Sequence, residues 1–214
     1  MSSDPAAFVR ANTRLTAPPL VPEIRLHLAT EVTPLWQATE AELEKNQLPP
    51  PYWAFAWAGG QALARHILDH LDIVSGRKIL DIGAGSGLVA IAAARAGAQA
   101  VAAEPDPFAL AAIALNAAAN DVVVTTENAD LIGAARAWDI VLAGDMCYER
   151  PLADRLIPWL RRLASEGALV LLGDPGRAYL PGSGLEELAR YTVPTSLDLE
   201  DRLSREAVVW RLTP

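Results

Sequence analysis

The stretch that decides the fold is Asp81-Ile-Gly-Ala-Gly-Ser-Gly87, a glycine-rich segment between two apolar runs. The run before it, 78–82, has the length and composition of a buried strand, and the run after it, 88–95, predicts a helix that ends at Gly97. Open α/β sheets bind nucleotides at a turn of this kind between a strand and a helix. The glycines let a ligand approach the backbone, and the helix N-terminus offers free N–H groups. The segment therefore predicts a site for a nucleotide-like ligand.

The alternation of strands and helices continues on both sides of this segment. An amphipathic helix is predicted to begin near Trp57, and helices are predicted at 107–116 and 150–164. Further strands are predicted at 98–103, 122–126, 139–143 and 168–172. A short helix is expected at 184–190, followed by strands at 191–199 and 206–212 with no helix between them. The pattern predicts a doubly wound, mostly parallel α/β sheet of seven strands with an antiparallel C-terminal hairpin.

The chain divides by composition into two parts. Residues 1–50 are predicted to form an N-terminal helical and proline-rich extension, and residues 51–214 the α/β domain. Prolines 49–51 prevent a helix from continuing across the boundary. A length of 214 residues fits one domain with a short appendage. The sequence leaves open whether the extension forms a lid over the ligand site.

Composition and charge exclude several classes of protein. The formal net charge of −8 argues against the broad phosphate affinity of a nucleic-acid-binding protein. No run approaches the ~18 consecutive apolar residues of a membrane span, so no membrane association is expected. Cys147 is the single cysteine, and the first residues lack the features of a secretion or transit signal. We therefore expect a cytoplasmic protein, and a monomer.

Two carboxylates indicate which nucleotide-like ligand the loop holds. The dinucleotide fingerprint requires a small residue at its sixth position, where Leu88 stands when the count starts at Gly83. Asp81 at the strand end would repel a pyrophosphate but attract an ammonium, and S-adenosylmethionine (SAM) carries an ammonium and no phosphate. Glu104 ends the next strand near the ~20-residue offset at which a carboxylate binds ribose hydroxyls. The alternative is that Asp81 caps a turn and that Glu104 is solvated.

With Glu104, the glycine-rich segment resembles motif I and the acidic position after it in the seven-β-strand SAM-dependent methyltransferases. The resemblance covers residues 57–214 and includes the antiparallel hairpin. It implies that SAM is the methyl donor and that a set of residues binds it: Trp57, Asp81, Gly83, Ala84, Gly85, Gly87, Glu104 and Asp130. Trp57, just before a helix that faces the loop, is expected to cover the cofactor. Trp53, Phe55 and Trp57 could instead be core aromatics.

The segment after the fourth predicted strand bears on the methyl acceptor. It lacks the Asn/Asp-Pro-Pro-Tyr/Phe motif of enzymes that methylate exocyclic or amide nitrogens. Asp145-x-x-Tyr148 instead resembles the Asp/Glu-x-x-Tyr/Phe signature of seven-β-strand protein-lysine methyltransferases. The resemblance implies that Asp145 orients the ε-amine and that Tyr148 walls its channel. Alternatively, Asp145 could cap the helix that begins near Arg150, and Tyr148 could be a packing aromatic.

Three further segments, 51–64, 115–120 and 173–181, resemble the lysine methyltransferases of the electron transfer flavoprotein β subunit. The resemblance implies that this subunit is the protein partner and suits a bacterial member of the group. Related chains methylate ribosomal protein L11, so a ribosomal protein is an alternative substrate. A small amine such as nicotinamide, or a SAM-binding module without turnover, are further alternatives.

Several other residues have competing interpretations. Asp174 and Arg177 could form an ion pair within a turn or a rim that positions substrate. Cys147 is expected to be a small buried residue because no histidine arrangement supports a nucleophile. His66 and His70 share a helix face but lack metal-ligand spacing, so no metal site is expected.

Overall fold

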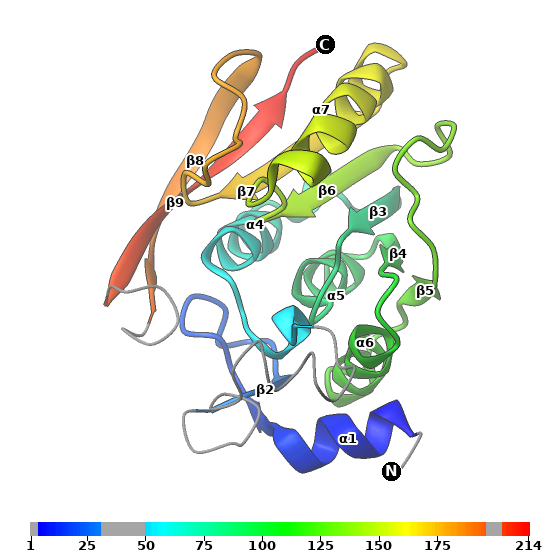
Figure 1. Ribbon diagram of the computed structural model, residues 1–214, viewed down its shortest axis with the longest axis vertical. Helices are drawn as coiled ribbons and strands as arrows, with labels where there is room; N and C mark the ends of the chain where they lie inside the picture. The colour runs from blue at the N-terminus through cyan, green and yellow to red at the C-terminus, as the bar shows by residue number, and fades with distance from the viewer. Residues whose placement is uncertain (1–3, 31–49, 196–202) are drawn as a thin grey trace.

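The computed structural model describes residues 4–30, 50–195 and 203–214, and a mixed β-sheet forms their centre (Figure 1). The sheet has seven strands in the order β5-β4-β3-β6-β7-β9-β8. The strands are β3 (Lys78–Ile82), β4 (Gln99–Ala103), β5 (Thr125–Glu127), β6 (Ile140–Gly144), β7 (Leu169–Asp174), β8 (Leu185–Pro194) and β9 (Ser204–Leu212). The first five run parallel to one another, and β9 pairs antiparallel with both β7 and β8. The predicted fold class is confirmed.

Helices cover both faces of this sheet. They are α4 (Ala58–Asp69), α5 (Leu88–Arg95), α6 (Pro107–Ala119) and α7 (Arg150–Ser165), with short 3-10 helices η1 (Tyr52–Ala54) and η2 (Leu71–Ile73). On β3, Ile79 faces the core under α4 and α5, whereas Leu80 faces the core under α7. Both side chains are fully buried. Apolar residues on both faces give the continuous runs from which these strands were predicted.

The predicted helix at 184–190 is wrong, because residues 185–190 belong to β8. Leu185 and Leu188 have helical spacing, but this segment pairs with β9, and from Ala189 onward the burial pattern of the strand alternates. The register of the pairing shifts between Glu187 and Ala189, as in a β-bulge. Pairing with β9 has overridden the local helical pattern. The end of the strand predicted to reach residue 199 lies outside the described residues.

The third predicted strand is shorter and later than expected. Hydrogen-bonded pairing covers only β5, while Val122 and Val124 pack against the core outside any strand. Val123 between them is 87% exposed. The apolar run that predicted a strand at 122–126 is therefore largely a connection between α6 and β5.

The N-terminal segment packs against the α/β domain through α6. It contains α1 (Pro5–Asn12) and a two-stranded sheet of β1 (Arg14–Thr16) and β2 (Leu26–Leu28). Asn120 accepts a hydrogen bond from the Arg25 N–H (2.9 Å) and donates to the Arg25 carbonyl (2.6 Å). Asn116 accepts from the His27 N–H (2.7 Å) and donates to the Ser86 carbonyl in the glycine loop (2.8 Å). Asn116 thus connects the N-terminal segment to the predicted ligand site.

The predicted division at residue 50 stays a prediction, and so does the question of a lid, because residues 31–49 lie outside the described part. Val21, Ile24 and Leu26 are fully buried and belong to the same core cluster as α4 and α5. In the described residues, no helix combines the length and the apolar character that crossing a membrane requires.

Candidate active site

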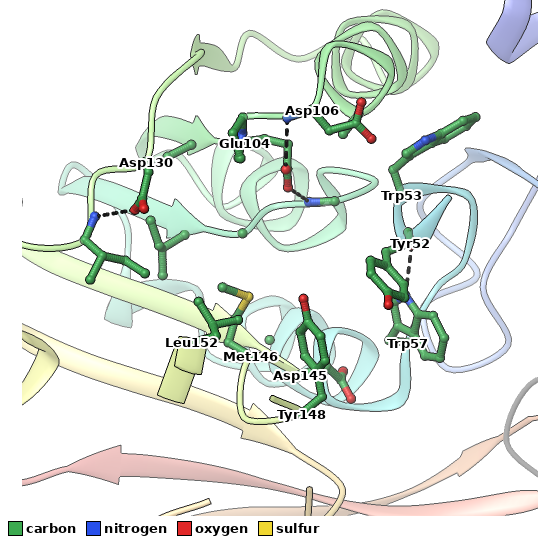
Figure 2. Close-up of a pocket in the computed structure, with 18 of the residues that line it drawn as sticks. Tyr52, Trp53, Trp57, Glu104, Asp106, Asp130, Asp145, Met146, Tyr148 and Leu152 are labelled. Atoms are coloured by element: carbon green, nitrogen blue, oxygen red, sulfur yellow. Dashed lines mark hydrogen bonds between the residues drawn. The ribbon is translucent and has the colours of Figure 1, made fainter. Parts of the chain in front are cut away.

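A cavity of about 470 Å³ opens at the carboxyl ends of β3, β4 and β6 (Figure 2). This is the edge at which open α/β sheets bind their ligands. Figure 2 shows Glu104 and Asp130 on one side of the cavity and Asp145, Met146 and Tyr148 on the other. Seven of the residues predicted from the sequence line it: Trp57, Gly83, Gly85, Glu104, Asp130, Asp145 and Tyr148. The structure therefore brings the predicted cofactor and acceptor segments to one site.

The glycine loop forms the floor of the cavity. Gly83 and Gly85 line it with φ angles of 64° and 52°, a left-handed region that favours glycine. A Cβ at Gly83 would lie 2.2 Å from the Met146 sulfur, so the Met146 side chain rests directly on this glycine. Ala84 and Gly87 are outside the cavity lining, and Gly87 is the N-cap residue of α5. They contribute to the shape of the loop.

Asp81 lies behind the glycine loop and outside the cavity lining. Its side chain is buried, and its Oδ2 accepts a hydrogen bond from the Ala90 N–H in the first turn of α5 (3.0 Å). Burial raises the pKa of Asp81 to about 7, the Ala90 hydrogen bond opposes this rise, and the charge of Glu104 adds to it. The predicted contact between Asp81 and a cofactor amino group stays a prediction.

Glu104 is fixed at the end of β4 by backbone hydrogen bonds. Its Oε2 accepts from the Gly85 N–H (3.0 Å) and its Oε1 from the Asp106 N–H (3.3 Å). Burial raises the pKa of Glu104, against the effect of these two bonds. The carboxylate is thereby held at the cavity wall next to the glycine loop, where it can accept hydrogen bonds from hydroxyl groups.

Asp106 is a cavity residue that was missed in the sequence. Its carboxylate is the N-cap of α6 and accepts a hydrogen bond from the Phe108 N–H (2.8 Å), with Pro107 as the first helical residue. The signal was present, because an aspartate before a proline at a helix start is a capping pattern. Its position two residues after Glu104 places it at the same wall.

Asp130 borders the end of the cavity beyond β4. Its Oδ1 accepts a hydrogen bond from the Ile132 N–H (3.0 Å), and its Oδ2 forms an ion pair with Arg155. Burial alone would raise the pKa of Asp130, but the Arg155 hydrogen bond and charge hold it below its ordinary value. Ala129 and Ile132 also line the cavity here. This end combines an apolar wall with one carboxylate.

Asp145 stands directly after β6 with a φ of 57°, in the left-handed region that aspartate and asparagine tolerate better than most residues. Its Oδ1 accepts two bonds from the Arg177 guanidinium, from Nε at 3.1 Å and from Nη2 at 2.7 Å. Its Oδ2 accepts from the Gly60 N–H in the first turn of α4 (2.9 Å). Burial raises the pKa of Asp145 to about 6, although Arg177 and Gly60 both lower it. Asp174 nearby raises it further.

Aromatic side chains surround Asp145 at the mouth of the cavity. The Tyr52 ring lies 5.6 Å from the Tyr148 ring and 6.2 Å from the Trp57 ring, between ring centres. The Trp57 Nε1–H donates to the Tyr52 carbonyl (2.9 Å), and the Arg177 guanidinium carbon lies 5.6 Å from the Trp57 ring centre. Burial raises the pKa of the Tyr148 hydroxyl to about 12, so it stays protonated at neutral pH. The arrangement can admit an extended cationic or amine side chain.

Comparison with known proteins identifies the family. The model of the ribosomal protein L11 methyltransferase (PrmA) family matches residues 61–173. The electron transfer flavoprotein beta subunit lysine methyltransferase of Xenopus laevis is 40% identical, over 98% of this chain and 87% of that protein. The chain belongs to the electron transfer flavoprotein β-subunit lysine methyltransferase family. The Homo sapiens protein of the same name is 36% identical, over 97% of this chain and 82% of that protein.

A solved structure supports the fold of this lysine methyltransferase family member. Magnesium protoporphyrin IX methyltransferase (ChlM) from Synechocystis PCC 6803, with bound SAM, superposes with a TM-score of 0.55. The match covers 73% of this chain and 80% of that one at 16% identity. This solved structure supports the fold alone. The identity to the Xenopus laevis protein confirms, at the level of the family, the resemblance predicted from the glycine loop and from Asp145-x-x-Tyr148.

The structure also decides several alternatives for this methyltransferase. Asp145 does not cap α7, because the N-cap position belongs to Glu149 and no side chain caps it. Cys147 is buried, and burial raises the pKa of its thiol to about 12. Asp174 Oδ1 accepts from the N–H groups of Gly176 and Arg177, while the Arg177 guanidinium extends to Asp145. Arg177 therefore belongs to the site.

The remaining aromatics and histidines are now placed. Trp53 is buried but also lines the cavity, whereas Phe55 packs edge-on against Trp57. The ring of His66 on α4 lies 4.5 Å from the ring of His70, the C-cap residue of that helix. Within the described ranges, no group of three or more histidine, cysteine or acidic side chains is arranged to hold a metal ion.

Proposed function

We propose that this protein transfers a methyl group from SAM to the ε-amine of a lysine on the electron transfer flavoprotein β subunit. The observation that carries the proposal is the 40% identity to the Xenopus laevis protein across 98% of this chain. The aligned region extends over nearly the whole chain and so spans both the glycine loop and the acceptor segment. The PrmA match makes a lysine of ribosomal protein L11 the second candidate.

The cavity has the chemical groups that SAM requires. Glu104, fixed by two backbone N–H groups, would accept hydrogen bonds from the ribose hydroxyls. Gly83 and Gly85 allow close approach to the backbone, and the apolar end beside Asp130 suits a flat base. Asp81, behind the loop, would act on the cationic amino group through its charge, and Trp57 would cover the cofactor from the mouth.

The acceptor side must present a neutral amine to the sulfonium. A free lysine with a pKa near 10.4 is neutral in roughly one molecule in 2,500 at pH 7. We assign Asp145 to orienting the amine through a hydrogen bond and Tyr148 to walling the channel. The proton leaves to water, and desolvation together with the approaching sulfonium lowers the pKa of the amine. Alignment and exclusion of water then supply the rate acceleration.

The test is a methyl-transfer assay with tritiated SAM and purified electron transfer flavoprotein, followed by mass spectrometry of the labelled peptides. We expect label on a lysine of the β subunit, and none with Asp145→Asn, which should keep SAM affinity in calorimetry. Asn tolerates the left-handed backbone at this position, so the variant is expected to fold. Label on ribosomal protein L11 alone, or on a small amine alone, would replace the proposed substrate.

We also propose that the protein works as a cytoplasmic monomer that engages neither nucleic acid nor membranes. The net charge of −8 disfavours nucleic acid and anionic lipid surfaces, and the free, buried Cys147 fits a reducing compartment. Light scattering during size-exclusion chromatography is expected to give a mass near 22.8 kDa. A dimer mass would overturn the monomer proposal.

A further inference from the structure

The carboxylate at the acceptor site creates a chemical difficulty. Methyl transfer consumes the lone pair of the amine, so an ammonium cannot react. An isolated carboxylate beside the amine would favour the ammonium form and slow the reaction. Asp145 lies at the cavity wall and is 8% exposed, so solvent screens its charge only weakly. Some group in the site must offset this charge if Asp145 is to help.

Arg177 is held directly on this carboxylate. Its Nε and Nη2 both donate to Asp145 Oδ1, at 3.1 and 2.7 Å. The Arg177 side chain is 16% exposed, and its guanidinium lies beside the Trp57 ring. The backbone is fixed as well, because Asp174 accepts the N–H groups of Gly176 and Arg177 at 2.7 Å each. A turn after β7 thus delivers the guanidinium to Asp145.

The remaining hydrogen-bonding capacity of Asp145 matches one N–H of an amine. A carboxylate has about four lone-pair positions. Arg177 takes two of them on Oδ1, and the Gly60 N–H takes one on Oδ2. One position on Oδ2 is left to accept a hydrogen bond from a substrate. The N-terminus of α4, to which Gly60 belongs, adds positive dipole character on that side.

We propose that Arg177 is a positioning residue that neutralises Asp145, so that the carboxylate orients the neutral amine of the substrate and does not retain it as an ammonium. This inference rests on the proposed lysine methylation. In the transfer, the nitrogen lone pair forms the new bond to the methyl carbon as the sulfur–carbon bond breaks. The electron pair of the broken sulfur–carbon bond remains on the sulfur, which becomes a neutral thioether. The methylated ammonium product then loses its proton to water, while Arg177 stays on Asp145.

Other charged and titratable groups near Asp145 remain after a substitution at Arg177, although the pKa of Asp174 also loses the lowering effect of the Arg177 charge. Asp174 at the end of β7 raises the pKa of Asp145. The charges of both carboxylates raise the pKa of the Cys147 thiol. Without the guanidinium, Asp145 and Asp174 would remain side by side. The N-terminus of α4 would still oppose the charge of Asp145, and the charge of Arg205 and two backbone N–H groups would still oppose that of Asp174. In the protein without substrate, Asp145 would therefore lose its proton at a higher pH. In the complex, the ionised carboxylate would hold the substrate amine as an ammonium.

The experiment compares Arg177→Gln with Arg177→Lys, using the full chain and the amine substrate that the unaltered protein labels. For Arg177→Gln we expect a lower kcat, an unchanged or lower KM for the protein substrate, and a kcat–pH profile displaced to higher pH by at least one unit. A displacement of one unit corresponds to about a tenfold loss of kcat at pH 7. Arg177→Lys keeps the charge and is expected to recover most of the unaltered profile.

Arg150→Gln is the matched control. Arg150 begins α7, stacks over Tyr179 (5.4 Å) and lies outside the cavity lining. Its loss removes the same charge without touching Asp145, so the pH profile should not move. Circular dichroism of all three variants checks that they are folded.

Two kinetic outcomes would overturn the inference. A raised KM with an unchanged pH profile in Arg177→Gln would make Arg177 a docking residue. A raised kcat/KM would mean that Arg177 competes with the substrate lysine for Asp145.

A measurement without substrate separates this inference from the proposed function. Carboxyl ¹³C NMR, with Asp145→Asn used for assignment, should show Asp145 titrating at a higher pH in Arg177→Gln than in the unaltered protein. Identical titration would overturn the inference, whichever substrate the enzyme has. Absence of label on the flavoprotein β subunit from the unaltered protein would instead refute only the proposed substrate.

Discussion

Replacing Asp81 by Asn tests how a buried carboxylate behind the glycine loop affects stability and cofactor affinity. Asp81 is 2% exposed, and its Oδ2 accepts one hydrogen bond, from Ala90, which an asparagine oxygen can also accept. Asn has nearly the same volume, so packing is little changed. The substitution therefore removes mainly the charge.

The expected stability change follows from the pKa of this group. Burial raises the pKa of Asp81 from 3.8 to about 7. Between these values the folded protein binds more protons than the unfolded chain, so stability falls as pH rises from about 4 to about 7. Each unit costs about 1.4 kcal/mol, giving a ceiling of about 4 kcal/mol above pH 7. An unsatisfied Asn N–H would cost about 1 to 3 kcal/mol at every pH.

The assay is urea unfolding of both proteins without SAM, at intervals between pH 5 and pH 8. The difference in unfolding free energy should shift in favour of Asp81→Asn by about 3 kcal/mol across this range. Titration of carboxylates that do not interact with Asp81 cancels in the comparison, and the interaction with Glu104 is the smallest of the three effects on the pKa of Asp81. A difference that is constant with pH would refute the assignment of a high pKa to Asp81.

The same variant tests the role of Asp81 toward the cofactor. Because the carboxylate acts from behind the loop, we expect calorimetry at pH 8 to show SAM binding about tenfold more weakly to Asp81→Asn, equivalent to about 1.4 kcal/mol. Stability and affinity would then change in opposite directions. Unchanged affinity would limit Asp81 to supporting the backbone of α5.

Three further outcomes are expected. A Cβ at Gly59 would lie 2.1 Å from the Gly173 carbonyl oxygen, whereas one at Gly60 meets nothing closer than 4.0 Å. Thermal unfolding should therefore show Gly59→Ala destabilised by about 3 kcal/mol and Gly60→Ala unharmed, and equal effects would contradict the close approach. Asn120→Ala removes two hydrogen bonds to the backbone of Arg25, just before β2, so hydrogen exchange of the amides there should accelerate by at least tenfold. Unchanged exchange would mean that other contacts hold this backbone in place. Cys147 should react with a thiol reagent at pH 8 only on unfolding, and rapid labelling of the native protein would show that this thiol is accessible.

The parts of the site that sequence predicted are those encoded locally. The glycine loop needs left-handed backbone angles at Gly83 and Gly85, and closely spaced glycines in the sequence indicate such angles. Glu104 follows at a fixed offset because β4 is adjacent to β3 in the sheet. Asp145 follows a strand that is apolar on both faces, so its position at the carboxyl edge could be inferred.

The parts that sequence could not give depend on partners far along the chain. The contact between Asp145 and Arg177 joins turns after two neighbouring strands, β6 and β7, and its geometry depends on the left-handed φ of Asp145. The position of Asp81 behind the loop depends on which face of β3 carries its side chain, and the sequence alone does not determine that face. The segment 185–190 has the local pattern of a helix, but it forms a strand because it pairs with β9.

The outer strand β8 has a consequence for how the protein behaves at high concentration. An exposed strand edge can recruit an edge from another molecule, which starts aggregation. Here a register shift after Glu187 interrupts the edge, and Glu186 and Arg190 add charges along it. At the other end of the sheet, β5 is only three residues long. Both borders are thus poor templates for intermolecular strand addition, and uncharged substitutions along β8 should make concentrated solutions prone to form fibrils.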